Sequence, residues 1–153
     1  MDSGKEKRIL IGVDDSEDSE KAVRYVAGLL GGLPGFFVTL LHIVPAAPDD
    51  YFFSDEDLGE WVAEHRTSAI SVMENYRSIL IQSGFREDSI AVMVETRYCP
   101  SVAECILDVQ QKTDCSTIVV GRKNLSRRQE LLFGSTSDRL LHSGTQYALW
   151  LVE

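Results

Sequence analysis

The stretch RILIGVDDS, from Arg8 to Ser16, predicts both the class of the fold and the place of a binding site. Its first six residues are a mostly apolar run, typical of a strand that is buried on both faces. The polar residues DDS end that run, and helical periodicity follows as far as Gly31. Ser16 can cap this helix, because its hydroxyl can accept a hydrogen bond from a free amide of the first turn. A strand, a short turn and a helix in succession indicate an α/β protein.

The same unit is repeated along the chain. Further strands are predicted over residues 36–44, 89–95, 116–121 and 147–153. Further helices are predicted over about 57–83, from Pro100 onward and over about 135–142. Strict alternation predicts right-handed crossovers and a parallel sheet with helices on both faces. We therefore expect a doubly wound, five-stranded parallel sheet that forms a single domain over residues 1–153.

Charge and composition exclude several function classes. The net charge of −9 argues against a nucleic-acid surface and against binding to an anionic membrane. The first eight residues lack the apolar region of a secretory signal, and no apolar run is long enough to span a membrane. The three cysteines show no CxxC spacing, so neither a zinc site nor a disulfide framework is expected and a reduced compartment fits best. These features predict a cytoplasmic protein.

A ligand site is expected where the strand order reverses, beyond the carboxyl ends of the strands. If the order is 3-2-1-4-5, the reversal lies between the first and fourth strands, which end at Val13-Asp14 and Val120-Gly121. Asp14 is a short acceptor that suits a ribose hydroxyl or a base amine. Four of the 15 basic side chains lie within residues 122–128, and residues 134–137, Gly-Ser-Thr-Ser, open a helix whose free amides can bind a phosphate. The alternative is an ordinary surface loop with solvated charges.

Three features resemble the universal stress protein family. They are VDDS after the first strand, LLHIVP over residues 40–45, and the loop after the fourth strand. Nucleotide-binding members of that family carry G-x2-G-x9-G-[ST]. Here Gly121 takes the first place and Gly134-Ser135 the last, with the x9 spacing intact, while Asn124 stands at the second glycine. Asparagine tolerates positive φ at a cost of about 1 kcal/mol. The GxxxxGK[ST], GxGxxG and GxSxG motifs are absent from the sequence.

The resemblance implies a flavodoxin-like, Rossmann-like three-layer sandwich with strand order 3-2-1-4-5 and a bound ATP or AMP. It implies that Asp14 meets the ribose or base, that Gly12 borders the pocket, and that Ile43 offers backbone contacts to adenine. The remaining residues implied to lie along the ribose and phosphates are Val120, Gly121, Asn124, Gly134, Ser135, Thr136 and Ser137.

The resemblance also implies a homodimer formed through the last strand, Tyr147 to Glu153. The function implied is a nucleotide-binding module in stress response or signalling with little or no catalysis, at most weak ATP hydrolysis. A nucleotide-free module of the same fold, for dimerisation and protein interaction, is the alternative that Asn124 motivates.

Overall fold

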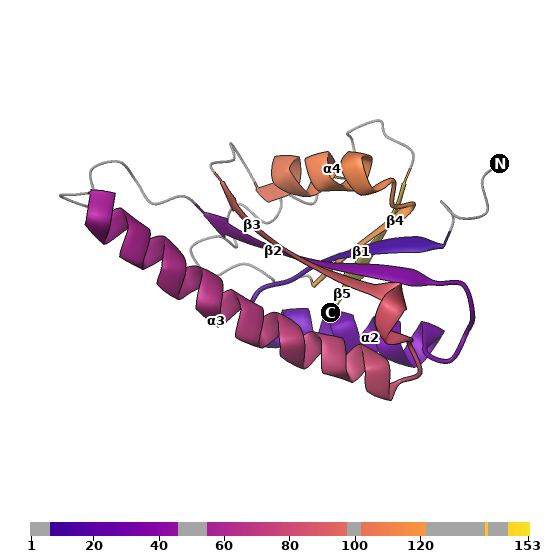
Figure 1. The fold of residues 1–153 in the computed structure, drawn as a ribbon. Helices are drawn as coiled ribbons and strands as arrows, with labels where there is room; N and C mark the ends of the chain where they lie inside the picture. Colours follow the sequence, from indigo (N-terminus) through magenta and orange to yellow (C-terminus); the bar gives the residue numbers. More distant parts are fainter. Residues whose placement is uncertain (1–6, 46–54, 98–101, 122–139, 141–146) are drawn as a thin grey trace.

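The computed structural model describes residues 7–45, 55–97, 102–121, 140 and 147–153, and these form a sheet with helices on both faces (Figure 1). Five parallel strands lie in the order β3-β2-β1-β4-β5. They are β1 (Arg8–Gly12), β2 (Phe37–Pro45), β3 (Ile90–Arg97), β4 (Thr117–Gly121) and β5 (Ala148–Val152). The predicted sheet and its strand order are therefore confirmed, with small differences at the strand ends.

The helices of the described residues form the two outer layers. They are α2 (Glu17–Leu30), α3 (Asp55–Gln82) and α4 (Val102–Thr113), with a short 3-10 helix at Glu87–Ser89 that the sequence did not predict. Figure 1 shows α2 and α3 below the sheet and α4 above it. The helix expected over residues 135–142 lies outside the described residues, apart from Leu140.

Alternating side chains of β1 fill both halves of the core. Ile9 and Ile11 pack with α2 and α3, whereas Leu10 packs with α4 on the opposite face. All three side chains are almost fully buried. Successive side chains of a strand point to opposite faces, so an unbroken apolar run is what a central strand between two helical layers requires.

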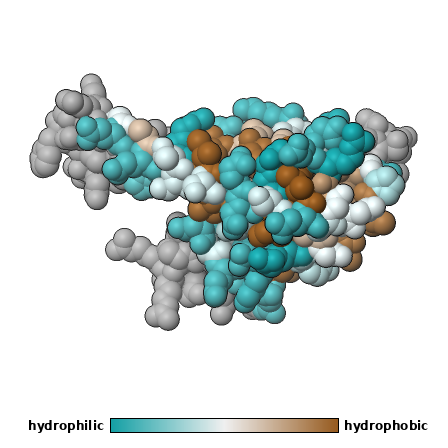
Figure 2. Space-filling model, turned by 60° about the horizontal axis from the view of Figure 1, so that its bottom comes forward, coloured by the Kyte–Doolittle hydropathy of each residue, from teal (hydrophilic) through white to brown (hydrophobic). Residues whose placement is uncertain are grey.

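The outer surfaces of α2 and α3 are mostly hydrophilic. Figure 2 shows this side of the molecule, where brown apolar residues form separate spots between teal hydrophilic ones. Among the described side chains of these helices, the exposed large apolar ones are Tyr25, Leu29 and Ile70. Both helices are thus amphipathic, and their apolar sides face the sheet.

Both ends of α2 follow the sequence prediction. The Ser16 hydroxyl accepts a hydrogen bond from the amide of Ser19 at 3.2 Å and caps the first turn. At the other end, Gly31 terminates the helix. A Cβ on Gly31 would lie 2.3 Å from the carbonyl oxygen of Ser83 at the end of α3. Glycine is therefore required here by packing between two helices, because its φ of −59° is open to any residue.

The cysteines correct one expectation. Cys105 is disulfide-bonded, whereas Cys115 is a free, buried thiol whose pKa is raised by burial. Residue spacing could not show this, because a disulfide depends on which chain segments meet in space. Within the described ranges, none of the helices combines the length and the apolar character needed to cross a membrane.

Candidate functional site

The strand order reverses between β1 and β4, which lie side by side as the sequence analysis required. Gly12 pairs with Val120 at the carboxyl ends of these two strands. On the other side of β1, Gly12 pairs with Leu41, and β2 continues past that point to Pro45. The end of β1 is thus flanked by a longer strand, which leaves a step at this edge of the sheet.

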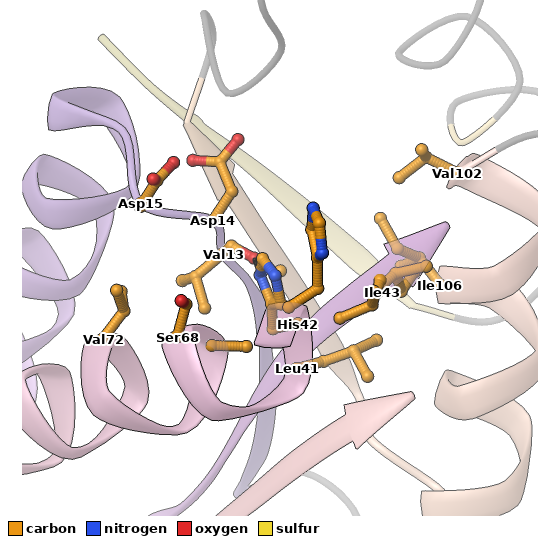
Figure 3. A pocket seen from close by; sticks show the side chains of 14 residues that line it. Val13, Asp14, Asp15, Leu41, His42, Ile43, Ser68, Val72, Val102 and Ile106 are labelled. Carbon is orange, nitrogen blue, oxygen red and sulfur yellow. Dashed lines mark hydrogen bonds between the residues drawn. The ribbon is translucent and has the colours of Figure 1, made fainter. Parts of the chain in front are cut away.

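A cleft of about 340 Å³ opens at this step, between α3 and α4. Figure 3 shows Asp14 and Asp15 on one side of it, Val102 and Ile106 of α4 on the other, and His42 between them. Its lining residues are Gly12, Val13, Asp14, Asp15, Leu41, His42, Ile43, Val44, His65, Ser68, Ala69, Val72, Val102 and Ile106.

Asp14 presents a fixed carboxylate at the mouth of this cleft. Its Oδ1 accepts hydrogen bonds from the amide of Ser16 at 2.8 Å and from the hydroxyl of Ser19 at 2.9 Å. The same Ser19 oxygen accepts the amide of Asp14 at 2.8 Å. Oδ2 accepts no hydrogen bond from the described residues. One carboxylate oxygen is therefore used to orient the side chain, and the other is available to a donor on a ligand.

Two side chains hold the backbone carbonyls at the end of β1. The Nδ1 of His42 lies 2.8 Å from the carbonyl oxygen of Val13, and the Tyr76 hydroxyl donates to the carbonyl oxygen of Asp14 at 2.6 Å. A carbonyl can only accept, so Nδ1 of His42 carries a proton in this contact. His42 also lines the cleft.

The Tyr76 phenol is kept protonated by its surroundings. Burial, followed by the negative charges of Asp14, Glu20 and Asp15, raises its pKa from 10.0 to about 12. Both effects disfavour the phenolate, since burial removes solvation and nearby carboxylates repel a second anion. Tyr76 therefore remains a hydrogen-bond donor throughout the physiological pH range.

The backbone of Ile43 faces the cleft. The amide of Val13 donates to the carbonyl oxygen of Leu41 at 2.8 Å, so the backbone groups of Leu41 point toward β1. Backbone groups of alternate residues point to the same side of a strand, so those of Ile43 also point toward β1. The register with β1 ends before Ile43. Its amide and carbonyl therefore offer one donor and one acceptor to a ligand.

The described part of the cleft contains apolar walls and acidic groups. Ile43, Val102 and Ile106 form an apolar side, and the ionisable lining residues are two aspartates and two histidines. Lysine and arginine are absent from the lining that the structure describes. This chemistry suits a flat, uncharged ring with hydroxyl or amine donors. A phosphate would need cations from elsewhere in the chain.

The predicted site residues fall into three groups. Gly12, Asp14 and Ile43 line the cleft together. Val120 and Gly121 are buried behind it: a Cγ of Val120 lies 3.3 Å from where a Cβ of Gly12 would be, and a Cβ on Gly121 would lie 2.5 Å from the carbonyl oxygen of Asp18. The remaining predicted residues, Asn124, Gly134, Ser135, Thr136 and Ser137, lie outside the described residues.

The sequence predicted the helix α3 but did not show that this helix forms one wall of the cleft. His65, Ser68, Ala69 and Val72 of α3 all line the cleft. Ser68, Ala69 and Val72 follow His65 by three, four and seven residues, and this spacing places all four on one helical face. That spacing was a usable signal. Which strand end the helix crosses could not be derived from periodicity, because packing between distant segments sets it.

Comparison with known proteins gives a family match over most of the chain. The model of the universal stress protein family matches residues 6–146. A universal stress protein of Mycolicibacterium smegmatis is 29% identical over 151 residues, covering 93% of this chain and 47% of that protein. The chain thus spans about half the length of this curated relative.

Solved structures share the fold over almost the whole chain. Universal stress protein UspA from Lactobacillus plantarum has a TM-score of 0.76 at 15% identity, covering 96% of this chain and 97% of the other. A universal stress protein from Archaeoglobus fulgidus in complex with dAMP has a TM-score of 0.62 at 20% identity, covering 95% and 97%. A universal stress protein in complex with cAMP has a TM-score of 0.65 at 13% identity, covering 96% of each chain.

Proposed function

Since the chain belongs to the universal stress protein family, whose model matches residues 6–146, we propose that its cleft binds an adenine nucleotide, ATP or AMP. We propose further that the protein acts as a nucleotide-binding module in stress response or signalling, with little or no turnover. Two proteins of the same fold are in complex with cAMP and with dAMP, which are both adenine nucleotides.

The observation that carries this proposal is the pairing of Ile43 and Asp14 in one cleft. The amide and carbonyl of Ile43 match the acceptor and donor along one edge of adenine. The apolar side chains of α4 and β2 can cover the faces of the ring. The open Oδ2 of Asp14 can accept a ribose hydroxyl, and Gly12 leaves room beside it.

The phosphates are assigned to the loop after β4. In this proposal they meet the amides and hydroxyls of residues 134–137, with Asn124 beside them and the cations of residues 122–128 nearby. In the same proposal Val120 and Gly121, at the end of β4, lie beside the ribose and phosphates. The scarcity of cations in the described cleft is consistent with a division into a nucleoside half and a phosphate half.

Isothermal titration of the purified protein with ATP and AMP tests the proposal. We expect saturable heat, and mass spectrometry of the native protein is expected to show a copurified nucleotide. Asp14→Ala and Gly134→Val should both abolish binding. Absence of heat at roughly millimolar nucleotide, where weak sites saturate, rejects the proposal. Phosphate release with added magnesium measures any turnover.

A nucleotide-free module for dimerisation and protein interaction is the alternative. Asn124 at the second glycine of the motif favours it, and so does β5 at the edge of the described sheet, where Leu151 is 43% exposed. In both readings we propose a homodimer through Tyr147 to Glu153. Asn124→Gly separates the two: a gain of nucleotide affinity that the wild type lacks supports the alternative.

Two further predictions concern the context of the chain. A single domain over residues 1–153 and a cytoplasmic location both remain proposals. Limited proteolysis tests the first, because a second folding unit would give a second stable fragment. Cell fractionation tests the second.

A further inference from the structure

We propose that Tyr76 is a positioning residue that sets the orientation of the Asp14 carboxylate toward the ligand. The inference deepens the proposed nucleotide-binding function and rests on it for its ligand. Tyr76 does not line the cleft itself, so its effect must pass through the turn after β1.

The contact joins two distant parts of the chain. Tyr76 lies on α3, 62 residues after Asp14, and its side chain is almost fully buried. Its hydroxyl donates to the carbonyl oxygen of Asp14 at 2.6 Å and lies 3.5 Å from that of Ser16. A buried phenol that binds a turn carbonyl ties this turn to the long helix.

The remaining polar groups of Asp14 are held from within the turn. Ser19 binds its amide, and Ser16 and Ser19 bind Oδ1. These partners all belong to the segment that follows β1, so they move with it. Tyr76 supplies the one contact from outside this segment to Asp14 itself among the described residues. Without it, His42 still holds the carbonyl of Val13, but none of the described hydrogen bonds joins Asp14 to α3, and the Asp14 carboxylate can shift relative to the cleft.

The same helix also supplies a wall of the cleft. Ser68 and Val72 precede Tyr76 on α3 by eight and four residues, which places all three on one side of the helix. The hydrogen bond from Tyr76 to the Asp14 carbonyl therefore fixes the separation between this wall and the Asp14 carboxylate. A loss of the tie should weaken binding of the nucleoside without removing any lining side chain.

Tyr76→Phe tests the proposal, because it removes only the hydroxyl. We expect its affinity for AMP, measured by isothermal titration, to be about tenfold weaker, the usual effect of one buried hydrogen bond. In the Asp14→Asn background, which is expected to keep measurable binding, the same change should cost almost nothing, because an NH2 group replaces the oxygen that Tyr76 orients toward the ligand. The matched control is Tyr25→Phe, an exposed tyrosine beside Trp150, which should bind as the wild type does. Equal losses in both backgrounds overturn the proposal.

A measurement without nucleotide separates this inference from the proposed function. The amide of Ser16 donates to Asp14 Oδ1, so the hydrogen-exchange rate of this amide reports how firmly the carboxylate is held. In Tyr76→Phe this amide should exchange at least about tenfold faster, whereas an unchanged exchange rate overturns the inference. If wild-type protein binds no nucleotide, the proposed function fails and this comparison still decides the role of Tyr76.

A third measurement covers the case in which Tyr76→Phe does not fold. The hydroxyl of a buried tyrosine that donates to a carbonyl exchanges its proton slowly with water. We therefore expect a resolved hydroxyl signal from Tyr76 in the wild-type protein. Rapid exchange of that proton means that the tie is not formed and overturns the proposal.

Discussion

The two carboxylate oxygens of Asp14 have different roles in the proposed site. Ser16 and Ser19 hydrogen-bond to Oδ1, whereas Oδ2 accepts no hydrogen bond from the described residues and is the oxygen that the proposal assigns to the ligand. An acceptor that is fixed before the ligand arrives reduces the ordering entropy that binding must overcome. In the proposed function, Ser16 and Ser19 therefore contribute to recognition without lining the cleft.

Asp14→Asn separates these roles. The amide oxygen can still accept from Ser16 and Ser19, but an NH2 group replaces the acceptor that faces the ligand. We expect affinity for AMP to weaken by about 2 kcal/mol, which corresponds to ~30-fold, with little change in stability. Asp88→Asn is the control, because Asp88 pairs with Arg86 in an exposed turn. Unchanged affinity in the Asp14→Asn variant would show that the ligand does not contact this carboxylate.

Tyr76 gives stability a dependence on alkaline pH. Its pKa is raised from 10.0 to about 12, so between these values the unfolded chain releases the phenolic proton and the folded protein keeps it. The unfolded state then binds fewer protons, and stability falls as pH rises through this window. Urea unfolding at several pH values should show the fall, and Tyr76→Phe should make it shallower. An equal slope in both proteins contradicts the assignment.

At the scale of elements, α2 and β4 meet at a glycine. A Cβ on Gly121 would lie 2.5 Å from the carbonyl oxygen of Asp18 and 2.8 Å from its carbonyl carbon. The obstacle is helix backbone, which cannot rotate aside as a side chain can. Gly121 takes the first glycine position of the family motif, and in the structure the absence of a Cβ lets the first turn of α2 lie against the end of β4.

Gly121→Ala should therefore destabilise the protein by about 1–3 kcal/mol, the usual cost of overpacking a rigid contact. Gly28→Ala is the matched control, since Gly28 lies inside α2 with nothing within 4 Å of an added Cβ. That change should stabilise the helix by ~0.5–1 kcal/mol. Urea unfolding measures both. If both variants lose stability, α2 tolerates no added methyl group in this region, and the cost of Gly121→Ala cannot be assigned to the contact with Asp18.

At the scale of the whole molecule, the described sheet ends at β5, whose outer edge has no neighbouring strand among the described residues. Leu151 is 43% exposed there, while Trp150 packs edge-on against Tyr25 of α2 at 6.3 Å between ring centres. An apolar edge strand can pair with another chain through its free backbone groups. These features support the homodimer proposed above.

Leu151→Lys should shift the protein from dimer to monomer, because a charge at the edge opposes strand pairing. Size-exclusion chromatography with light scattering measures the change over a range of concentrations. Leu33→Lys serves as the control, since Leu33 is similarly exposed at 52% and lies just after α2, away from β5. Dimers that persist in the Leu151→Lys variant would place the interface elsewhere, and a monomeric wild type would contradict the homodimer itself.

Much of the fold could be predicted because its signals are local. The apolar run at Ile9 to Ile11 indicates a strand buried on both faces, and Ser16 caps a helix with its own neighbours. The disulfide of Cys105 and the 3-10 helix at Glu87–Ser89 could not be predicted in this way. The first depends on a pairing in space and the second is too short to show periodicity.

The sequence by itself determined the alternation of strands and helices and the presence of Asp14 just after the first strand, because periodicity and chain direction suffice for these features. The strand order, and with it the reversal beside β1, was predicted through the resemblance to the universal stress protein family, and the sheet confirms it. Only the tertiary structure decided that α3 forms a wall of the cleft, that Ile43 turns its backbone into it, and that Tyr76 binds the carbonyl of Asp14 across 62 residues. Such contacts follow from the relative placement of packed elements, and no local pattern of residues encodes that placement.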